Sequence, residues 1–307
     1  MDFSKELRIG TRASVLAHWQ ANWVRDELVR LGFNASIIPI ATQGDRDQQS
    51  SLADVGGQGV FTKEIQKALL QGTIDLAVHS LKDLPTETMA GLQIAAVPKR
   101  ASSSDALVSR VGNSLRDLPP TARVATGSPR RRAQLLHFRS HFQFVDLRGN
   151  VDTRLRKLDE GECDALILAE AGLQRLGLAA RITELISPKI MLPAIGQGAL
   201  GIEIRSGDKP TFTAVTQLND NHSELGVLAE RSMLSALRAG CLAPVGALSS
   251  VTPQGITLTG VVLNSTGTRR LVASSEDTVD APRELGKRIA EELFSQGASE
   301  LIAESGS

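Results

Sequence analysis

Short apolar runs of strand length alternate with helix-like segments along the first two thirds of the chain. The runs occupy residues 7–10, 36–41, 74–78, 92–97, 123–126, 142–147 and 165–168, with a break at 99–105. Strands that alternate with helices favour an α/β fold with mixed, mostly parallel sheets. The last third differs, because residues 256–262 and 270–273 alternate like antiparallel strands between helical segments at 223–239 and 282–295. This pattern predicts a small C-terminal α+β domain.

Capping residues mark three helix starts that follow predicted strands. Ser14 can cap a helix that ends at Gly32, and Ser128 stands before Pro129, which suits the first helical position. Asn150 can cap a helix that extends to about residue 160. Free N–H groups and the helix dipole favour anions at such starts.

Composition excludes several classes of protein. Lys and Arg together number 34, as do Asp and Glu, so the 307-residue chain has no net charge and is not a wholly basic, nucleic-acid-coating protein. Two cysteines, Cys163 and Cys241, cannot build a disulfide framework or a zinc site by themselves. No apolar run approaches the roughly 20 residues of a membrane span, and acidic residues near the start argue against a signal peptide. We therefore expect a soluble protein of a reducing compartment without a metal site.

Arginine is concentrated in one window of this neutral chain. Residues 123–156 contain eight arginines, no lysine and two acids, a net charge of +6. The planar guanidinium fork grips carboxylates and phosphates through paired hydrogen bonds. Three interpretations are open: a solvated basic helix face with scattered ion pairs, a nucleic-acid surface, or a site for a small polyanion. The neutral charge and the low aromatic content of 3% argue against nucleic acid.

Three further segments are candidates for chemistry. Residues 79–85 follow a predicted strand and place Asp83 beside Lys82, either as a functional carboxylate or as part of a surface turn. Cys241 follows a predicted helix end, where it is an accessible thiol or a small buried hydrophobe. The Gly-rich segment 192–201 lacks the spacing of a nucleotide-binding loop, and we assign Cys163 no role.

Taken together, several segments resemble the porphobilinogen deaminase family, also called hydroxymethylbilane synthases, from Leu7 to about Ala303. The most specific are TRAS (11–14), AVHSLKDLP (77–85), LRGNV (147–151), AGLQRLG (171–177), LPAIGQGALG (192–201) and GCLAPVG (240–246). The resemblance implies that four porphobilinogen molecules are joined head to tail with loss of ammonia, and that water releases linear hydroxymethylbilane for tetrapyrrole (haem) biosynthesis.

The resemblance also implies roles for individual residues. The family attaches a dipyrromethane cofactor to a cysteine through a thioether, and Cys241 matches that cysteine. Asp83 matches the catalytic aspartate, which stabilises positive charge on the pyrrole nitrogen as ammonia leaves. Cofactor contacts match Ser80, Lys82, Asp83, Thr126, Ser128, Arg130, Arg131, Arg148 and Gly149. Substrate contacts match Arg12, Ser14, Arg148, Arg154 and Arg175. Each pyrrole carries an acetate and a propionate, so the arginines become intelligible as carboxylate partners.

The implied fold has two domains that resemble type II periplasmic binding proteins, followed by the cofactor-bearing domain. Domain 1 is expected at 1–98 and 198–218, domain 2 at 99–197 and the C-terminal domain at 219–307. A monomer in the cytoplasm is expected, with no nucleic acid, membrane or obligate protein partner. We also expect hinge motion between domains 1 and 2.

The chain departs from the family pattern in the polar loop 42–59. Many relatives carry lysines there, where this chain has Asp54 and Gln58. The main rival interpretation is a solute-binding protein of the same two-domain fold, which the third domain with Cys241 argues against. A second rival, a nucleic-acid or regulatory protein, has no helix-turn-helix signature to support it.

Overall fold

The computed structural model of the chain describes residues 6–41, 62–240 and 243–304. Contacts within the chain group it into two compact units, Met1–Ala101 with Ala199–Glu224 and Ser102–Gly198 with Leu225–Ser307. The predicted α/β fold with mixed sheets and a small C-terminal α+β portion is confirmed.

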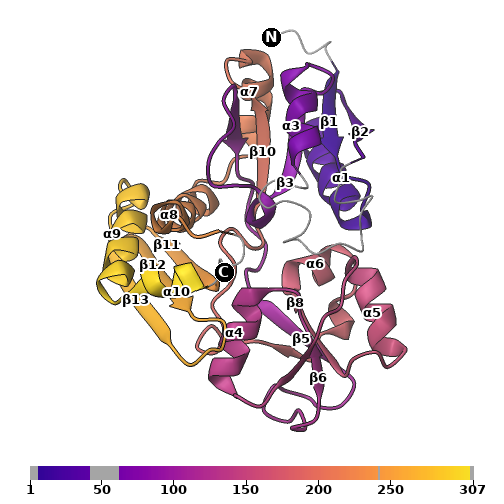
Figure 1. The fold of residues 1–307 in the computed structure, drawn as a ribbon. Helices are drawn as coiled ribbons and strands as arrows, with labels where there is room; N and C mark the ends of the chain where they lie inside the picture. Colours follow the sequence, from indigo (N-terminus) through magenta and orange to yellow (C-terminus); the bar gives the residue numbers. More distant parts are fainter. Residues whose placement is uncertain (1–5, 42–61, 241–242, 305–307) are drawn as a thin grey trace. The chain divides into compact units, whose positions relative to one another are not determined.

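The first unit contains one five-stranded sheet with helices on both faces (Figure 1). Its elements are β1 (Leu7–Thr11), α1 (Val15–Arg30), β2 (Ala35–Pro39), α3 (Lys63–Leu70), β3 (Leu76–Ser80), the 3-10 turn η1 (Leu81–Asp83), β4 (Leu92–Ala96), β10 (Leu200–Arg205), α7 (Lys209–Val215) and η3 (Thr216–Leu218). Leu76 and Val78 pack with α1, whereas Ala77 packs with α3 on the opposite face. The strand is therefore buried on both sides, as its continuous apolar run predicts.

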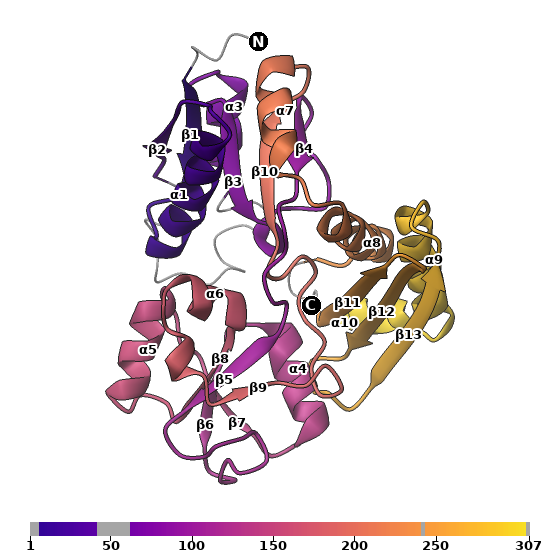
Figure 2. The same ribbon diagram turned by 180° about the vertical axis from the view of Figure 1, so that it is seen from behind.

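The strand order of this sheet is β2-β1-β3-β10-β4. β1 pairs in parallel with β2 and β3, and β10 runs antiparallel between β3 and β4, as Figure 2 shows. A strand from the far side of the sequence thus completes the sheet that the N-terminal segment begins.

The second unit repeats this topology in its first part. The elements are β5 (Asp105–Ser109), β6 (Arg123–Ala125), α4 (Pro129–Phe138), β7 (Gln143–Val145), α5 (Val151–Asp159), β8 (Ala165–Ala169), α6 (Glu170–Arg175), η2 (Ala179–Arg181) and β9 (Glu184–Leu185). The order is β7-β6-β8-β5-β9, with β6 parallel to β7 and β8 and with β5 antiparallel to β8 and β9. α4 covers one face, and α5 and α6 cover the other.

The rest of the second unit is an antiparallel sheet in the order β11-β12-β13 with helices packed on it. Its elements are α8 (Asn221–Leu237), within which the division between the units falls, β11 (Val245–Thr252), β12 (Gly255–Leu263), β13 (Arg270–Asp277), α9 (Pro282–Ser295) and α10 (Ala298–Glu304). Val261 and Leu263 pack against Ala133 of α4. His137 Nδ1 donates to the carbonyl of Gly267 at 2.9 Å, so the β12–β13 turn rests on α4.

Two of the three predicted helix caps are confirmed. The Ser14 hydroxyl accepts the Ala17 N–H at 3.3 Å, and the Ser128 hydroxyl accepts the Arg131 N–H at 3.5 Å. Asn150 precedes α5, but its side chain makes no capping hydrogen bond. Among the described residues, no helix is long and apolar enough to cross a membrane.

Candidate functional site

The turn after β3 carries Ser80, Lys82 and Asp83, and the chain anchors it through Leu81. The Leu81 N–H donates to the carbonyl of Ala199 at 3.1 Å, and its side chain is fully buried. Gly201 of β10 lies directly beneath, since a Cβ at Gly201 would stand 2.5 Å from Leu81 Cδ2. Lys82 and Asp83 are exposed. A buried leucine thus anchors a short turn that exposes one cationic and one anionic side chain to solvent.

The loop between β1 and α1 carries the other two candidates of the first unit. Arg12 follows the last residue of β1 and is half-buried, while Ser14 caps α1. β1 and β3 are parallel neighbours, so their carboxyl ends lie at one edge of the sheet, where ligands of such sheets bind. Gln20 of α1 donates to the Ser80 hydroxyl at 2.9 Å and joins the two elements.

A buried cluster of three polar side chains lies next to the same turn. His79 Nε2 is 3.0 Å from Glu203 Oε2, and Gln66 Nε2 donates to Glu203 Oε1 at 3.0 Å. The three side chains come from β3, β10 and α3 and are almost completely buried. They fix the strand that leads into Asp83 to the strand that completes the sheet.

The arginine window of the second unit divides into two groups. In the first group, Arg123 pairs with Asp164, Arg156 pairs with Glu160, Arg139 donates to the carbonyls of 115, 116 and 118, and Arg132 lies 5.2 Å from the Phe144 ring centroid. The ion-pair interpretation therefore holds for part of the window. The remaining four are Arg130, Arg131, Arg148 and Arg154.

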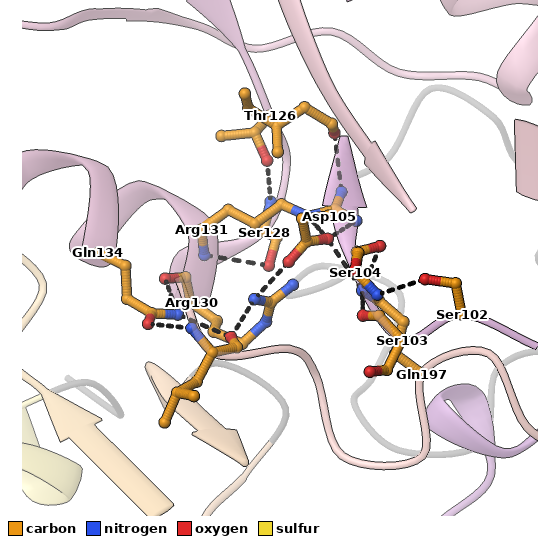
Figure 3. A network of polar contacts seen from close by, with 12 residues as sticks. Ser102, Ser103, Ser104, Asp105, Thr126, Ser128, Arg130, Arg131, Gln134 and Gln197 are labelled. Atoms are coloured by element: carbon orange, nitrogen blue, oxygen red, sulfur yellow. Dashed lines mark hydrogen bonds and ion pairs between the residues drawn. The ribbon is translucent and has the colours of Figure 1, made fainter. Parts of the chain in front are cut away.

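Arg130 and Arg131 are buried, with 5% and 7% of their surface exposed. Figure 3 shows both side chains converging on Asp105 at the start of β5. Arg130 Nη1 donates to Asp105 Oδ2 at 2.8 Å and to the Leu192 carbonyl at 2.6 Å. Arg131 donates to Asp105 Oδ1 through Nε and Nη2, at 2.9 and 2.7 Å, and to the Ile167 carbonyl through Nη1.

Arg154 is a half-buried cation at the start of α5. Its Nε donates to the Gly149 carbonyl at 2.8 Å, and within the described residues it has no carboxylate partner. Burial lowers the pKa of Arg154, and the charges of Arg131 and Arg148 lower it further. Mutual repulsion of this kind shows that these arginines share one neighbourhood, which an anion would stabilise.

Thr126 and Ser128 lie at the start of α4, next to the buried arginines. The Thr126 hydroxyl accepts the Ser128 N–H at 3.3 Å, and Ser128 caps the helix. Arg175 ends α6 and donates from Nη2 to the Gly198 carbonyl at 2.7 Å. Burial lowers the pKa of Arg175 to about 10, so its charge also lies in a poorly solvated place.

Of the two cysteines, Cys163 lies within the described residues. Cys241 and the loop that carries Asp54 and Gln58 lie outside the described residues. Cys163 is buried two residues before β8, and burial raises the pKa of its thiol to about 11. An uncharged, inaccessible thiol is a poor nucleophile.

Sequence reasoning missed Asp105, Gln197 and Gln134. Gln197 Nε2 donates to Asp105 Oδ1 at 3.0 Å, and the Gln134 side chain exchanges hydrogen bonds with the backbone of Leu192 (Figure 3). Gln197 lies within the Gly-rich segment, which offered the one available signal. Asp105 offered none, because its partners are distant in sequence.

The donor set has a definite chemical preference. Two arginines contact the ionised Asp105, and the charge of Arg131 acts on Arg154, as does that of Arg148. The result is a net positive group next to a helix start, suited to a ligand with several carboxylates or phosphates. No group of three or more His, Cys, Asp or Glu within the described ranges could hold a metal ion.

Two family models match the chain. The model described as "Porphobilinogen deaminase, dipyromethane cofactor binding domain" matches residues 7–213, and "Porphobilinogen deaminase, C-terminal domain" matches residues 225–295. Curated relatives match over nearly the full length. The porphobilinogen deaminase of Syntrophotalea carbinolica is 45% identical over 302 residues, which cover 98% of this chain and 96% of the relative. That of Chlorobaculum tepidum is 44% identical over 305 residues, which cover 98% of each.

Solved structures similar to this chain include periplasmic binding proteins. The methionine-binding protein MetQ is 13% identical, with a TM-score of 0.45, and the match covers 69% of this chain and 89% of MetQ. A periplasmic substrate-binding protein of an ABC transporter from Coxiella burnetii is 17% identical, with a TM-score of 0.43, and the match covers 69% of this chain and 91% of that protein.

Proposed function

The chain belongs to the porphobilinogen deaminase family, and from this membership we propose that it is a hydroxymethylbilane synthase, a transferase of tetrapyrrole biosynthesis. It joins four porphobilinogen molecules head to tail, and water then releases the linear product. Each joining step forms a carbon–carbon bond, breaks the bond between the aminomethyl carbon and nitrogen, and releases ammonia. The observation that carries the proposal is 45% identity over 98% of the chain to a named deaminase.

The residues of the second unit fit a dipyrromethane. Among the described residues, the Nε of Arg130 is a buried donor without a hydrogen-bond partner, and Arg154 is a half-buried cation without a carboxylate. A dipyrromethane bound through a thioether to Cys241 would supply the nucleophilic pyrrole carbon for the first joining step. The side chains that would hold its acetates and propionates are Ser80, Lys82, Thr126, Ser128, Arg130, Arg131 and Arg148, together with the backbone of Gly149.

Asp83 is the proposed catalytic residue. When ammonia leaves the substrate, positive charge develops on its pyrrole nitrogen, and a fixed carboxylate oxygen of Asp83 would stabilise that charge. The buried side chain of Leu81 and its hydrogen bond to Ala199 keep the turn in place before substrate arrives. Such positioning costs no reorganisation during the reaction.

Substrate carboxylates are proposed to bind Arg12, Ser14, Arg148, Arg154 and Arg175. The lowered pKa values of Arg154 and Arg175 support this role, because each reports a cation that burial destabilises. A bound carboxylate returns the stabilisation that these cations lost when they left water.

The organisation of the chain completes the proposal. We propose domain 1 at 1–98 and 198–218, domain 2 at 99–197 and a cofactor-bearing domain at 219–307, in a monomer that works in the cytoplasm. The assignment of the β10 strand to the N-terminal sheet supports the return of the chain to domain 1.

Intact mass under denaturing conditions tests the function. The wild-type chain is expected to carry an adduct equal to two condensed porphobilinogen units, and Cys241→Ser to carry none. Cys163→Ala is the matched control, because it removes the other thiol, and it should keep the adduct. A wild-type chain that stays unmodified after porphobilinogen is added, and that releases no ammonia, would instead be a binding protein.

A further inference from the structure

Asp105 is the residue on which the buried arginines of the second unit converge. It begins β5, where its backbone is paired with Ala169 and its carbonyl accepts the Ile186 N–H at 2.9 Å. Its carboxylate is 2% exposed and accepts four hydrogen bonds, two from Arg131, one from Arg130 and one from Gln197. A rigid strand thus fixes a carboxylate, and the carboxylate fixes two guanidinium groups.

The carboxylate is ionised whenever the protein is folded near neutral pH. Burial by itself would raise the pKa of Asp105, but the charges of Arg130 and Arg131 outweigh burial and lower it well below its usual range. Two cations nevertheless meet one anion, and Arg148 and Arg154 add further positive charge. Asp105 therefore does not neutralise the cluster.

What Asp105 does is select which guanidinium hydrogens stay available. It takes one Nη of Arg130, while neither Nε nor Nη2 of Arg130 has a partner among the described residues. A guanidinium held along one edge presents its other edge in a fixed orientation, which is what a planar carboxylate requires.

Gln197 braces Asp105 in turn. Its Nε2 donates to Asp105 Oδ1 and also to the carbonyls of Ser103 and Ser104, at 2.7 and 3.3 Å. The amide therefore ties the carboxylate to the chain segment just before β5. Removing it would loosen Asp105 without removing either ion pair.

We propose that Asp105 is a positioning residue, which orients Arg130 and Arg131 to receive the carboxylates of a pyrrole ligand and is itself braced by Gln197. The proposal rests on the proposed function for the identity of the ligand. For Asp105→Asn, positioning predicts weaker binding of the anionic ligand, which is the opposite of what charge alone predicts. If Asp105 acted through charge alone, Asp105→Asn would strengthen anion binding, because it removes a negative charge from the cluster.

The test compares the full chain with Asp105→Asn, Asp105→Glu and Gln197→Met. Asp105→Glu keeps the charge but displaces it by one methylene, so positioning predicts that the adduct fraction in the intact mass falls. It also predicts that the KM for porphobilinogen rises about tenfold, because a dipyrromethane displaced with Arg130 and Arg131 no longer meets the substrate in the right place. Gln197→Met should shift both readouts in the same direction by less. Asp164→Asn is the matched control, because it breaks an arginine pair at the other end of β8, and it should leave KM unchanged.

KM separates positioning from a structural role, since a lower folded fraction changes the rate but not the KM of the molecules that remain folded. A KM within twofold of wild type in folded Asp105→Glu and Gln197→Met would overturn the proposal, as would a lower KM in Asp105→Asn. If Asp105→Asn fails to fold, the other two variants decide. If the wild-type chain stays unmodified after porphobilinogen is added and releases no ammonia, the proposed function fails. Calorimetry with porphobilinogen then decides, and equal affinity of wild type and Asp105→Glu, or no binding, overturns the inference.

Discussion

Arg123 binds Asp164 through the same pattern of hydrogen bonds by which Arg8 binds Asp75. The backbone N–H and Nε of Arg8 donate to Asp75 Oδ2 at 3.0 and 2.9 Å, and those of Arg123 donate to Asp164 Oδ2 at 2.8 and 3.2 Å. Each arginine stands in the first parallel strand of its sheet, and each aspartate precedes the third. The two five-stranded sheets therefore share a side-chain device as well as a strand order.

This equivalence assigns Arg123 to the architecture and separates it from the anion cluster. We predict that Arg123→Gln lowers the Tm by about 1–3 °C at pH 7 and leaves the KM for porphobilinogen unchanged. The hydrogen bonds of Arg123 lower the pKa of Asp164, so the stabilisation is present above the unfolded pKa of roughly 3.9 and is lost as pH falls through the lower folded pKa. Thermal melts of both proteins should therefore converge in acid, and a raised KM would contradict the assignment.

Arg154→Gln should raise the thermal stability of the protein and weaken its binding of substrate. Because burial and two neighbouring arginines disfavour its charge, removing that charge in a Cys241→Ser background, which lacks the cofactor, should raise the Tm by about 2–4 °C. With Cys241 present, the KM should rise about tenfold, the loss of one carboxylate contact. Arg156→Gln, two residues further along α5 and paired with exposed Glu160, is the control and should change neither quantity. A Tm of the Arg154→Gln/Cys241→Ser variant below that of Cys241→Ser would contradict this prediction.

Gly201→Ala should damage catalysis through the turn that carries Asp83. A Cβ at this position would stand 2.5 Å from Leu81 Cδ2 and 3.0 Å from its Cγ, so the Leu81 side chain must shift, and we expect the shift to disturb the turn that follows. We expect kcat to fall about tenfold with little change in KM. Gly10→Ala crowds Ile74 in the same sheet and serves as the control for lost stability. Equal kcat values for the two variants would show that the packing of Leu81 against Gly201 does not affect catalysis.

Thiol titration should distinguish the two cysteines. With a pKa of about 11, roughly one Cys163 in a thousand is a thiolate at pH 8, and the residue is also buried. The native wild-type protein should show no fast-reacting thiol, and the denatured protein should show one, from Cys163. A second thiol on denaturation would mean that Cys241 carries no thioether.

Local sequence signals predicted the elements whose determinants are local. The capped starts of α1 and α4 and both ends of α9 agree with the sequence analysis, because caps and helix-terminal prolines act on adjacent residues. β3 begins two residues later than expected, a shift that hydrophobicity alone does not resolve.

β5 and β10 escaped prediction for a different reason. The Ser-rich break at 99–105 concealed the start of β5, and the glycines before Leu200 concealed β10, although Leu200, Ile202 and Ile204 show the alternation of a strand. The role of Asp105 was beyond any local signal, since its partners lie 25 to 92 residues away. Charge density pointed to the arginine cluster, but only contacts divided its members into two groups.

The placement of β10 has a consequence for how the chain is made. β3 and β4 flank β10 without pairing each other, so when a ribosome has released the first hundred residues, both strands still have an open edge. The sheet of β5 to β9 uses a continuous stretch of sequence and can close while synthesis continues. The N-terminal sheet cannot be completed until the strand that begins at Leu200 has been synthesised, so the part of the chain that is translated first completes its fold later. Until then the unpaired edges of β3 and β4 are exposed, and the chain is most prone to aggregation.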